Sequence, residues 1–191
     1  ILIGTQMITK GLDFKNIGLV GVINTDHFLN FPDFRAHEKA FQILTQVAGR
    51  SGRSGDRGKV FMQTYQPDHP IIKNVIENDY EKMYKNQLLE RKDYNYPPFV
   101  RLIRITIKDK SYEKLNSSGD WLNRVIRDNY KGIVLGPVYP EISRIKNKYH
   151  KQFLIKLRNL DELNRFRSIF QKIQKSFDSI SKYRSVRIIV D

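Results

Sequence analysis

The chain has 191 residues, of which 40% are hydrophobic and 12% aromatic, and it has no cysteine. This length corresponds to one large or two small domains, and the apolar content is enough for packed cores, which excludes a disordered tail. The absence of cysteine excludes a disulfide framework and a cysteine-ligated zinc site within these residues. No apolar run approaches the roughly 18 residues of a membrane-spanning helix, and the chain starts at Ile1 without a signal segment, so we expect a soluble fragment of a longer protein.

Positive charge is concentrated in the second half of the chain. Residues 1–96 contain 13 Lys and Arg against 11 Asp and Glu, whereas residues 97–191 contain 21 against 9. Nearly all of the formal net charge of +14 therefore lies after residue 96. Such a charge favours a polyanion such as nucleic acid, an acidic protein segment or an anionic lipid surface. A generally lysine-rich proteome is the alternative, and it explains the difference between the halves less well.

The first half alternates between predicted strands and helices. Short apolar runs predict buried strands of the parallel type, and apolar residues spaced three or four apart predict helices. These strands and helices together predict part of an α/β domain. A helical stretch follows and ends before the two prolines at 97 and 98, where we place the domain boundary. The expected strands are residues 1–3, 18–23 and 59–65, and the expected helical stretches are 34–47 and 69–93.

The second half has the order strand, helix, strand, strand, helix, strand. Alternation of apolar and polar residues favours strands with one covered face, and helical stripes supply the cover. The result is a small α+β domain of split βαβ type, with helices on one side and an open basic sheet on the other. The expected strands lie at 103–108, 131–138, 153–158 and 186–190, and the expected helices at 112–129 and 163–177. The cations expected to share the open face are Arg104, Lys108, Lys156, Arg158 and Arg187.

A basic run at residues 146–151 belongs to no predicted strand. We interpret it as a loop that is either solvated or holds phosphate without reading bases, since sequence readout needs groups placed at base edges. Four scattered histidines without ligand spacing do not predict a metal site.

Two segments of the first half have the residue types of a phosphate-binding site. In residues 46–53, Arg50 and Arg53 each follow a glycine, so two planar bidentate donors stand on backbone that can approach a ligand closely. In residues 4–13, the Thr5 hydroxyl and backbone amides can contact a nucleic-acid phosphate, while the Asp13 carboxylate can orient an arginine or a ribose. For the first segment alone, a glycine-rich turn with incidental arginines is the alternative.

Together these two segments resemble motifs V and VI of superfamily 2 helicases. The sequences at residues 10–14 (KGLDF), 33–36 (DFRA) and 46–53 (QVAGRSGR) resemble those of the PriA-type replication-restart helicases, a family also called primosomal protein N′. Residues 96–99 (YPPF), 135–137 (LGP) and 149–156 resemble the C-terminal domain of that family. The resemblance covers nearly the whole chain.

The resemblance implies a different domain and a different role for each segment of the chain. Residues 1–66 would be the end of the second RecA-like lobe, residues 67–96 a helical linker and residues 97–191 an S10-like C-terminal domain. Arg53 would be the arginine finger that reaches the γ-phosphoryl group of ATP, with Arg50 beside it. Four residues would bind ATP or couple its state to the rest of the lobe: Gln46, Gly49, Asp13 and Gly11. Thr5, Lys10 and the five cations of the open sheet would bind DNA.

The function implied is that of an ATP-dependent 3′–5′ DNA helicase that recognises stalled forks and initiates primosome assembly. Its implied cofactors are ATP with Mg²⁺, and zinc in the intact protein; its implied partners are branched and single-stranded DNA, single-stranded-DNA-binding protein and primosome proteins, in the bacterial cytoplasm at the nucleoid. The chain has no phosphate-binding loop, acidic magnesium box or cysteines, so by itself it is predicted to hydrolyse nothing.

Two other readings stay open. One is a different superfamily 2 translocase, and the other is a non-catalytic module that binds nucleic acid or an acidic tail.

His150 stands where the family usually has arginine, so a contact there would be weaker and sensitive to pH.

Overall fold

The structure, a computed structural model, describes residues 1–5, 17–51 and 58–191. The chain divides into two compact units, Ile1–Glu90 and Arg91–Asp191. This division falls inside the helix Tyr80–Asp93. The domain limits at residues 66 and 96 stay a prediction.

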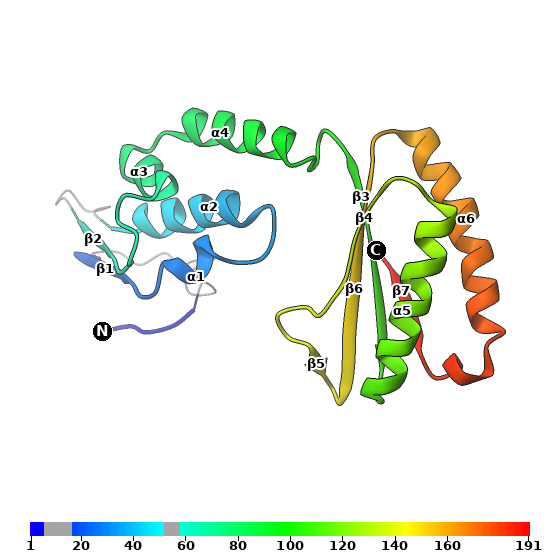
Figure 1. The fold of residues 1–191 in the computed structure, drawn as a ribbon. Helices are drawn as coiled ribbons and strands as arrows, with labels where there is room; N and C mark the ends of the chain where they lie inside the picture. The colour runs from blue at the N-terminus through cyan, green and yellow to red at the C-terminus, as the bar shows by residue number, and fades with distance from the viewer. Residues whose placement is uncertain (6–16, 52–57) are drawn as a thin grey trace. The chain divides into compact units, whose positions relative to one another are not determined.

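The first unit has a parallel pair of strands with helices (Figure 1). β1 pairs with β2 in parallel, so the crossover that joins them contains α2, as expected for an α/β unit. The helices bury apolar side chains against one another, among them Phe41, Leu44, Ile71 and Met83. The elements are β1 (Leu19–Val22), α1 (Asp26–Leu29), α2 (Ala36–Ala48), β2 (Lys59–Met62), α3 (Pro70–Glu77) and α4 (Tyr80–Asp93).

One expectation for the first unit was wrong, and another was confirmed only in part. Residues 1–3 form no strand, and their side chains are exposed. Among the described residues, the sheet of this unit holds only β1 and β2, and neither of them pairs with residues 1–3. The helical stretch 69–93 is broken, because Asn78 adopts a left-handed conformation (φ 53°) and the Asp79 carboxylate accepts a hydrogen bond from the Lys82 N–H (2.9 Å) to start α4.

The second unit has the predicted order of strands and helices. Its sheet is antiparallel throughout, in the order β4-β6-β3-β7, and the short β5 pairs with β6. Helices α5 and α6 lie on one side of the sheet (Figure 1). The elements are β3 (Arg101–Asp109), α5 (Tyr112–Asn129), β4 (Ile133–Val138), β5 (Arg144–Ile145), β6 (Lys148–Leu157), α6 (Leu160–Asp178), a 3₁₀ turn (Ser181–Tyr183) and β7 (Arg187–Val190).

Side chains start both helices. The Ser111 hydroxyl accepts a hydrogen bond from the Lys114 N–H (3.3 Å) at the start of α5. Asn159 does the same for the Glu162 N–H (2.8 Å) at the start of α6. Glu162 in turn accepts from the Arg158 N–H (2.6 Å), so two backbone donors that precede the helical ladder are satisfied.

The core of the second unit lies between the helices and one face of the sheet. The predicted stripe of α6 is buried there, and the alternating residues of β3 and β6 meet it from the sheet. Trp121 packs against Phe177 with ring centroids 5.7 Å apart. The buried stripe consists of Leu163, Phe166, Phe170, Ile173 and Phe177, and the sheet contributes Ile103, Ile105, Ile107, Phe153, Ile155 and Leu157.

β7 is much shorter than β3. It pairs with Ile105 to Lys108, and one further backbone pair joins Asp191 to Arg104. Within residues 91–191, the first residues of β3 therefore have no strand on this side.

Candidate nucleic-acid interface

The helicase-like residues are only partly within the described structure. Arg53, Lys10, Gly11 and Asp13 lie outside the described residues. The remaining residues predicted for nucleotide contacts, Gln46, Gly49 and Arg50, lie together at the end of α2. Thr5 is described and exposed.

The end of α2 is a tight turn. The Gly49 N–H donates to the Thr45 carbonyl (2.9 Å), and the Arg50 N–H donates to the Val47 carbonyl (3.1 Å). The Ser51 hydroxyl donates to the Ala48 carbonyl (3.0 Å), which holds the chain close to the helix as it leaves. Gln46 lies in the last turn of α2 and Arg50 follows the C-cap residue Gly49, so both residues lie at the end of the helix.

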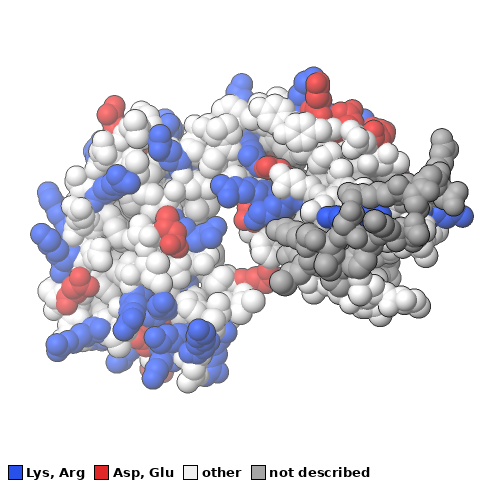
Figure 2. All heavy atoms as spheres, turned by 180° about the vertical axis from the view of Figure 1, so that it is seen from behind, with Lys and Arg blue, Asp and Glu red and all other residues white. Residues whose placement is uncertain are grey.

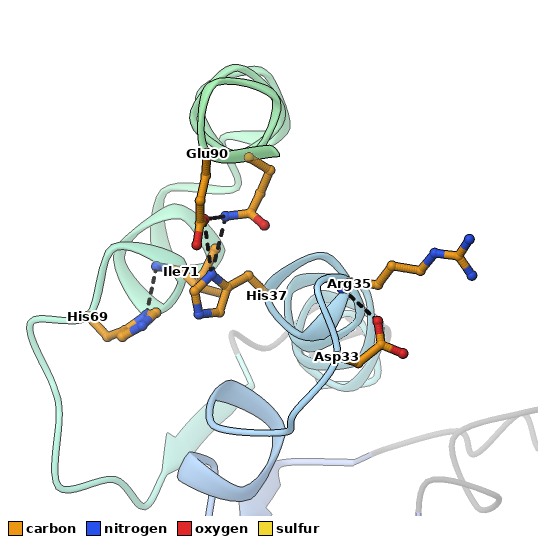
Figure 3. A network of polar contacts seen from close by, with 7 residues as sticks. Asp33, Arg35, His37, His69, Ile71 and Glu90 are labelled. Carbon is orange, nitrogen blue, oxygen red and sulfur yellow. Dashed lines mark hydrogen bonds and ion pairs between the residues drawn. The ribbon is translucent and has the colours of Figure 1, made fainter. Parts of the chain in front are cut away.

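Asp33 and two histidines form polar contacts within the first unit (Figure 3). The Asp33 carboxylate accepts a hydrogen bond from the Arg35 N–H (2.8 Å) and forms an ion pair with Lys39 (3.2 Å), so it fixes the start of α2 and its pKa is lowered by these contacts in spite of partial burial. The Arg35 side chain points away from this network.

His37 of α2 links this helix to α4. Its Nδ1 lies 3.2 Å from the Gln87 amide nitrogen and 3.6 Å from the Glu90 carboxylate, both on α4. The ring of His69 lies 5.1 Å away, and its Nδ1 accepts the Ile71 N–H (3.2 Å) to cap α3. Burial, more than the nearby His37, lowers the pKa of His69. This cluster therefore connects three helices of the first unit.

The strand register places four of the five predicted cations on one face of the second sheet. Arg104 and Lys108 of β3 alternate with Ile103, Ile105 and Ile107, whose side chains are buried under the helices. Lys108 pairs with Arg187 of β7, so both side chains point to the face away from α5 and α6. Lys156 of β6 is on this face by register as well.

Lys156 and Arg158 differ from the others. Lys156 is only 7% exposed, its Nζ donates to the Tyr94 carbonyl (2.6 Å), and the same atom lies 3.8 Å from the centroid of the Tyr96 ring. Burial lowers the pKa of Lys156. Arg158 follows β6 and lies beyond the regular sheet. Lys156 thus anchors the segment before β3, and the exposed cations of the strands on this face are Arg104 and Arg187, with Lys108 half-buried.

The positive charge of residues 97–191 is not neutralised by ion pairs among these residues. In residues 97–191, all of which are described, no Lys or Arg nitrogen lies within 4.0 Å of a carboxylate oxygen. The ion pairs between described residues all lie between Asp33 and Glu90. Figure 2 shows Lys and Arg side chains over much of the second unit with few Asp or Glu between them. The exposed cations of this segment therefore stay available to a polyanion outside the chain.

The basic run at 146–151, expected as a loop, is strand from Lys148 onward. Lys148, His150 and Lys151 are part of β6. Lys148 and His150 lie on the same face as Arg104, Lys108 and Arg187, which we call the basic face. Lys151 points to the other face, where it is buried with its Nζ 5.0 Å from the Tyr139 ring. The alternation of Lys148, His150 and Gln152 with their neighbours continues the pattern of residues 153–157, and this signal identifies the earlier start of the strand.

His150 has cationic neighbours and no partner for one ring nitrogen. It pairs directly with Lys108, and Lys148 stands two residues before it on the same face. Burial first, and then these two lysines, lower its pKa. Its Nδ1 is buried without a hydrogen-bond partner.

The described residues contain neither a group of metal ligands nor a membrane-spanning helix. No three or more His, Asp or Glu side chains at 1–5, 17–51 and 58–191 are grouped so that they could hold a metal ion. No helix in the described part of the chain is long and apolar enough to cross a membrane.

Comparison with known proteins agrees with the geometry of the second unit. Residues 92–191, just over half of the chain, match the family model of the Primosomal protein N C-terminal domain. The chain belongs to the PriA family. Over its whole length it is 37% identical to the replication restart protein PriA of Bacillus subtilis and 39% identical to that of Chlamydia muridarum. It is 39% identical to PriA of Synechocystis over 82% of the chain.

The chain spans about a quarter of the length of the first two PriA proteins, 24% and 25%, and 19% of the third. It therefore corresponds to the C-terminal region of PriA, and the basic unit described above corresponds to the matched PriA domain.

Proposed function

We propose that this chain is the C-terminal part of an ATP-dependent 3′–5′ DNA helicase that acts at stalled forks and initiates primosome assembly, and that residues 97–191 bind the DNA backbone for it. The observation that carries the proposal is the uncompensated charge of residues 97–191, which hold 21 Lys and Arg against 9 Asp and Glu with no ion pair among them. Membership of the PriA family supports the same reading.

The basic face suits a phosphate backbone better than base edges. Its cations lie on neighbouring strands of a sheet, where the side chains stand about 4.8 Å apart across the strands. Contacts of this kind neutralise phosphates and release condensed counterions, which gives affinity without sequence selectivity. Exposed side chains such as Arg104 and Arg187 are free to make them.

The first unit would supply part of the motor. A parallel strand pair joined through α2 suits the end of a RecA-like lobe, and the β4-β6-β3-β7 order of the second unit suits an S10-like domain. Gln46 and Arg50 lie at the end of α2, seven and three residues before Arg53 in the sequence. Arg53 would reach ATP and Mg²⁺ that the rest of PriA binds.

The DNA-binding proposal is tested by fluorescence anisotropy with a labelled single-stranded oligonucleotide and the whole chain. We expect binding that weakens steeply with salt, and an Arg104→Gln variant whose salt slope is lower by about 0.7, as for one lost phosphate contact. Lys172→Gln, which removes an exposed charge on α6 from the helical side, is the matched control and should leave the slope nearly unchanged.

Binding that is independent of salt, or tighter binding of an acidic peptide than of DNA, would instead make this face a protein-binding surface. A labelled forked duplex measured alongside the single strand shows whether the unit distinguishes branched DNA.

The motor proposal is tested in the full-length protein. Arg53→Ala should reduce DNA-stimulated ATP hydrolysis strongly, because arginine fingers contribute about 10³ to 10⁵ in rate in other nucleotide hydrolases. DNA binding should stay close to that of the unchanged protein. An unaltered turnover rate would remove the assignment of Arg53.

A further inference from the structure

Three side chains form a row across the basic face. Arg187 of β7, Lys108 of β3 and His150 of β6 are direct cross-strand partners, so they lie side by side on neighbouring strands. We call these three residues the cationic row. Lys148, two residues before His150, stands next to the row on the same face.

The cationic row is unfavourable for the isolated chain. Like charges directly opposite each other in a sheet are destabilising. Neither Lys108 nor Arg187 forms an ion pair or a side-chain hydrogen bond within the described residues. A bound anion would remove this repulsion, and no carboxylate of residues 97–191 does so.

His150 is the member of the row whose charge can change near neutral pH. The charged groups that act on it are Lys108 from β3 and Lys148 from its own strand, with Arg187 one strand further away. From the segment before β5, the Ser143 carbonyl accepts the His150 backbone N–H (2.8 Å) and leaves the imidazole alone. All of these charges are positive, so they oppose the imidazolium in the free chain.

We propose that the cationic row binds one phosphate of the DNA backbone and that His150 takes up a proton when the phosphate binds. The proposal rests on the function proposed above and adds a named site and its regulation by pH. A phosphodiester stays singly negative over the physiological range, so it favours the imidazolium just as the lysines disfavour it. DNA then binds more tightly at lower pH.

The test is the DNA affinity of the whole chain at about pH 6 and about pH 8, at fixed chloride concentration and without phosphate buffer. A rhodamine label is used because its emission does not titrate in this range. We expect binding about three- to tenfold tighter at the lower pH, since one linked proton changes affinity by at most tenfold per pH unit. His150→Gln should reduce this change to less than about twofold.

Two further variants separate the row from general charge. His150→Arg is charged at both pH values, so it should bind tightly with no pH dependence. Lys108→Gln should weaken binding more than Lys172→Gln does, because only the first belongs to the row. His27, His37 and His69 are present in every variant, so any effect of theirs on the pH dependence is common to all.

A direct readout is the pKa of His150 from NMR, with and without the oligonucleotide. It should rise when DNA binds. An unchanged pKa, or an unchanged pH dependence in His150→Gln, would overturn the proton uptake while salt-dependent DNA binding still stands. If the unsubstituted chain does not bind DNA, the proposed function itself is overturned.

Discussion

Replacing Lys156 by methionine separates structural cations from binding cations on the same face. Methionine keeps the length of the apolar stem but loses the hydrogen bond to the Tyr94 carbonyl (2.6 Å) and the contact with the Tyr96 ring (3.8 Å). A hydrogen bond to a charged group contributes about 1.5–3 kcal/mol, and a cation over an aromatic ring about 0.5–2 kcal/mol.

The net loss is smaller than the sum of these contributions. Burial of the ammonium group opposes them, which is the reason that its pKa is lowered. We therefore expect Lys156→Met to lower the free energy of unfolding of the second unit by about 1–3 kcal/mol, or about 4–8 °C in Tm for each kcal/mol.

The assay is urea unfolding followed by tryptophan fluorescence. Trp121 is the only tryptophan of the chain and packs against Phe177, so its emission reports the second unit. Lys172→Met, an equal loss of charge at an exposed position of α6, is the control for stability and for DNA affinity. The reasoning is refuted if Lys156→Met unfolds like the control but loses DNA affinity as Arg104→Gln does.

Three other substitutions test the packing and the polar contacts of the two units. Gly136→Ala should lower the free energy of unfolding by about 1–3 kcal/mol in the same fluorescence assay, because Gly136 has φ +97° and an added Cβ would lie 2.5 Å from the Gln152 carbonyl oxygen. Tyr130→Phe should cost about 1–2 kcal/mol there, since the Tyr130 hydroxyl donates to the Glu162 carboxylate (2.8 Å). Asp26→Asn should destabilise the first unit at neutral pH but not in acid, measured by hydrogen exchange of the Tyr65 amide.

The direction of the Asp26 effect follows from its hydrogen bonds. The Tyr65 N–H (3.0 Å) and the Thr64 hydroxyl (2.8 Å) donate to its carboxylate and lower its pKa below 3.8. Stabilisation by Asp26 is therefore present above the pKa of the unfolded chain and disappears as pH falls through the lower pKa of the folded chain. Equal exchange rates for both proteins at neutral pH would contradict this assignment, as unchanged unfolding midpoints would for Gly136 and Tyr130.

Much of the second unit could be predicted because one face of each strand is buried. Ile103, Ile105 and Ile107 alternate with polar residues, and this pattern fixes both the strand and the side that meets the helices. Helix α5 spans the predicted residues 112–129 in spite of Gly119. An added Cβ at Gly119 would lie 3.3 Å from the Ile107 side chain, so the glycine allows the helix close to the sheet.

The errors come from signals that short-range patterns do not contain. Lys146 and Asn147 both have positive φ and connect β5 to β6, a hairpin turn whose usual signal is Asn-Gly. Without that signal the basic run was interpreted as a loop. Asn78 ends α3 by the same left-handed conformation, which the charged stretch around it conceals.

The candidate site was predicted only as a face of a sheet. Alternation places Lys156 on it, but the contact that buries this lysine comes from Tyr94, 62 residues earlier in the chain. Pairing across strands, which brings Lys108 between Arg187 and His150, likewise needs the register and not the composition.

The short β7 has a consequence for solubility. Within residues 91–191, the backbone of β3 before Arg104 pairs with β6 on one side only, and its open side lies beside a cavity of about 460 Å³ that is also lined by Leu163, Phe166 and Phe170. Such an edge can template the addition of a strand from another molecule. Arg101 and Arg167 line the same cavity, so two copies that approach edge to edge bring arginines together and repel each other. Concentrated salt weakens this repulsion, and self-association through the edge then becomes more favourable.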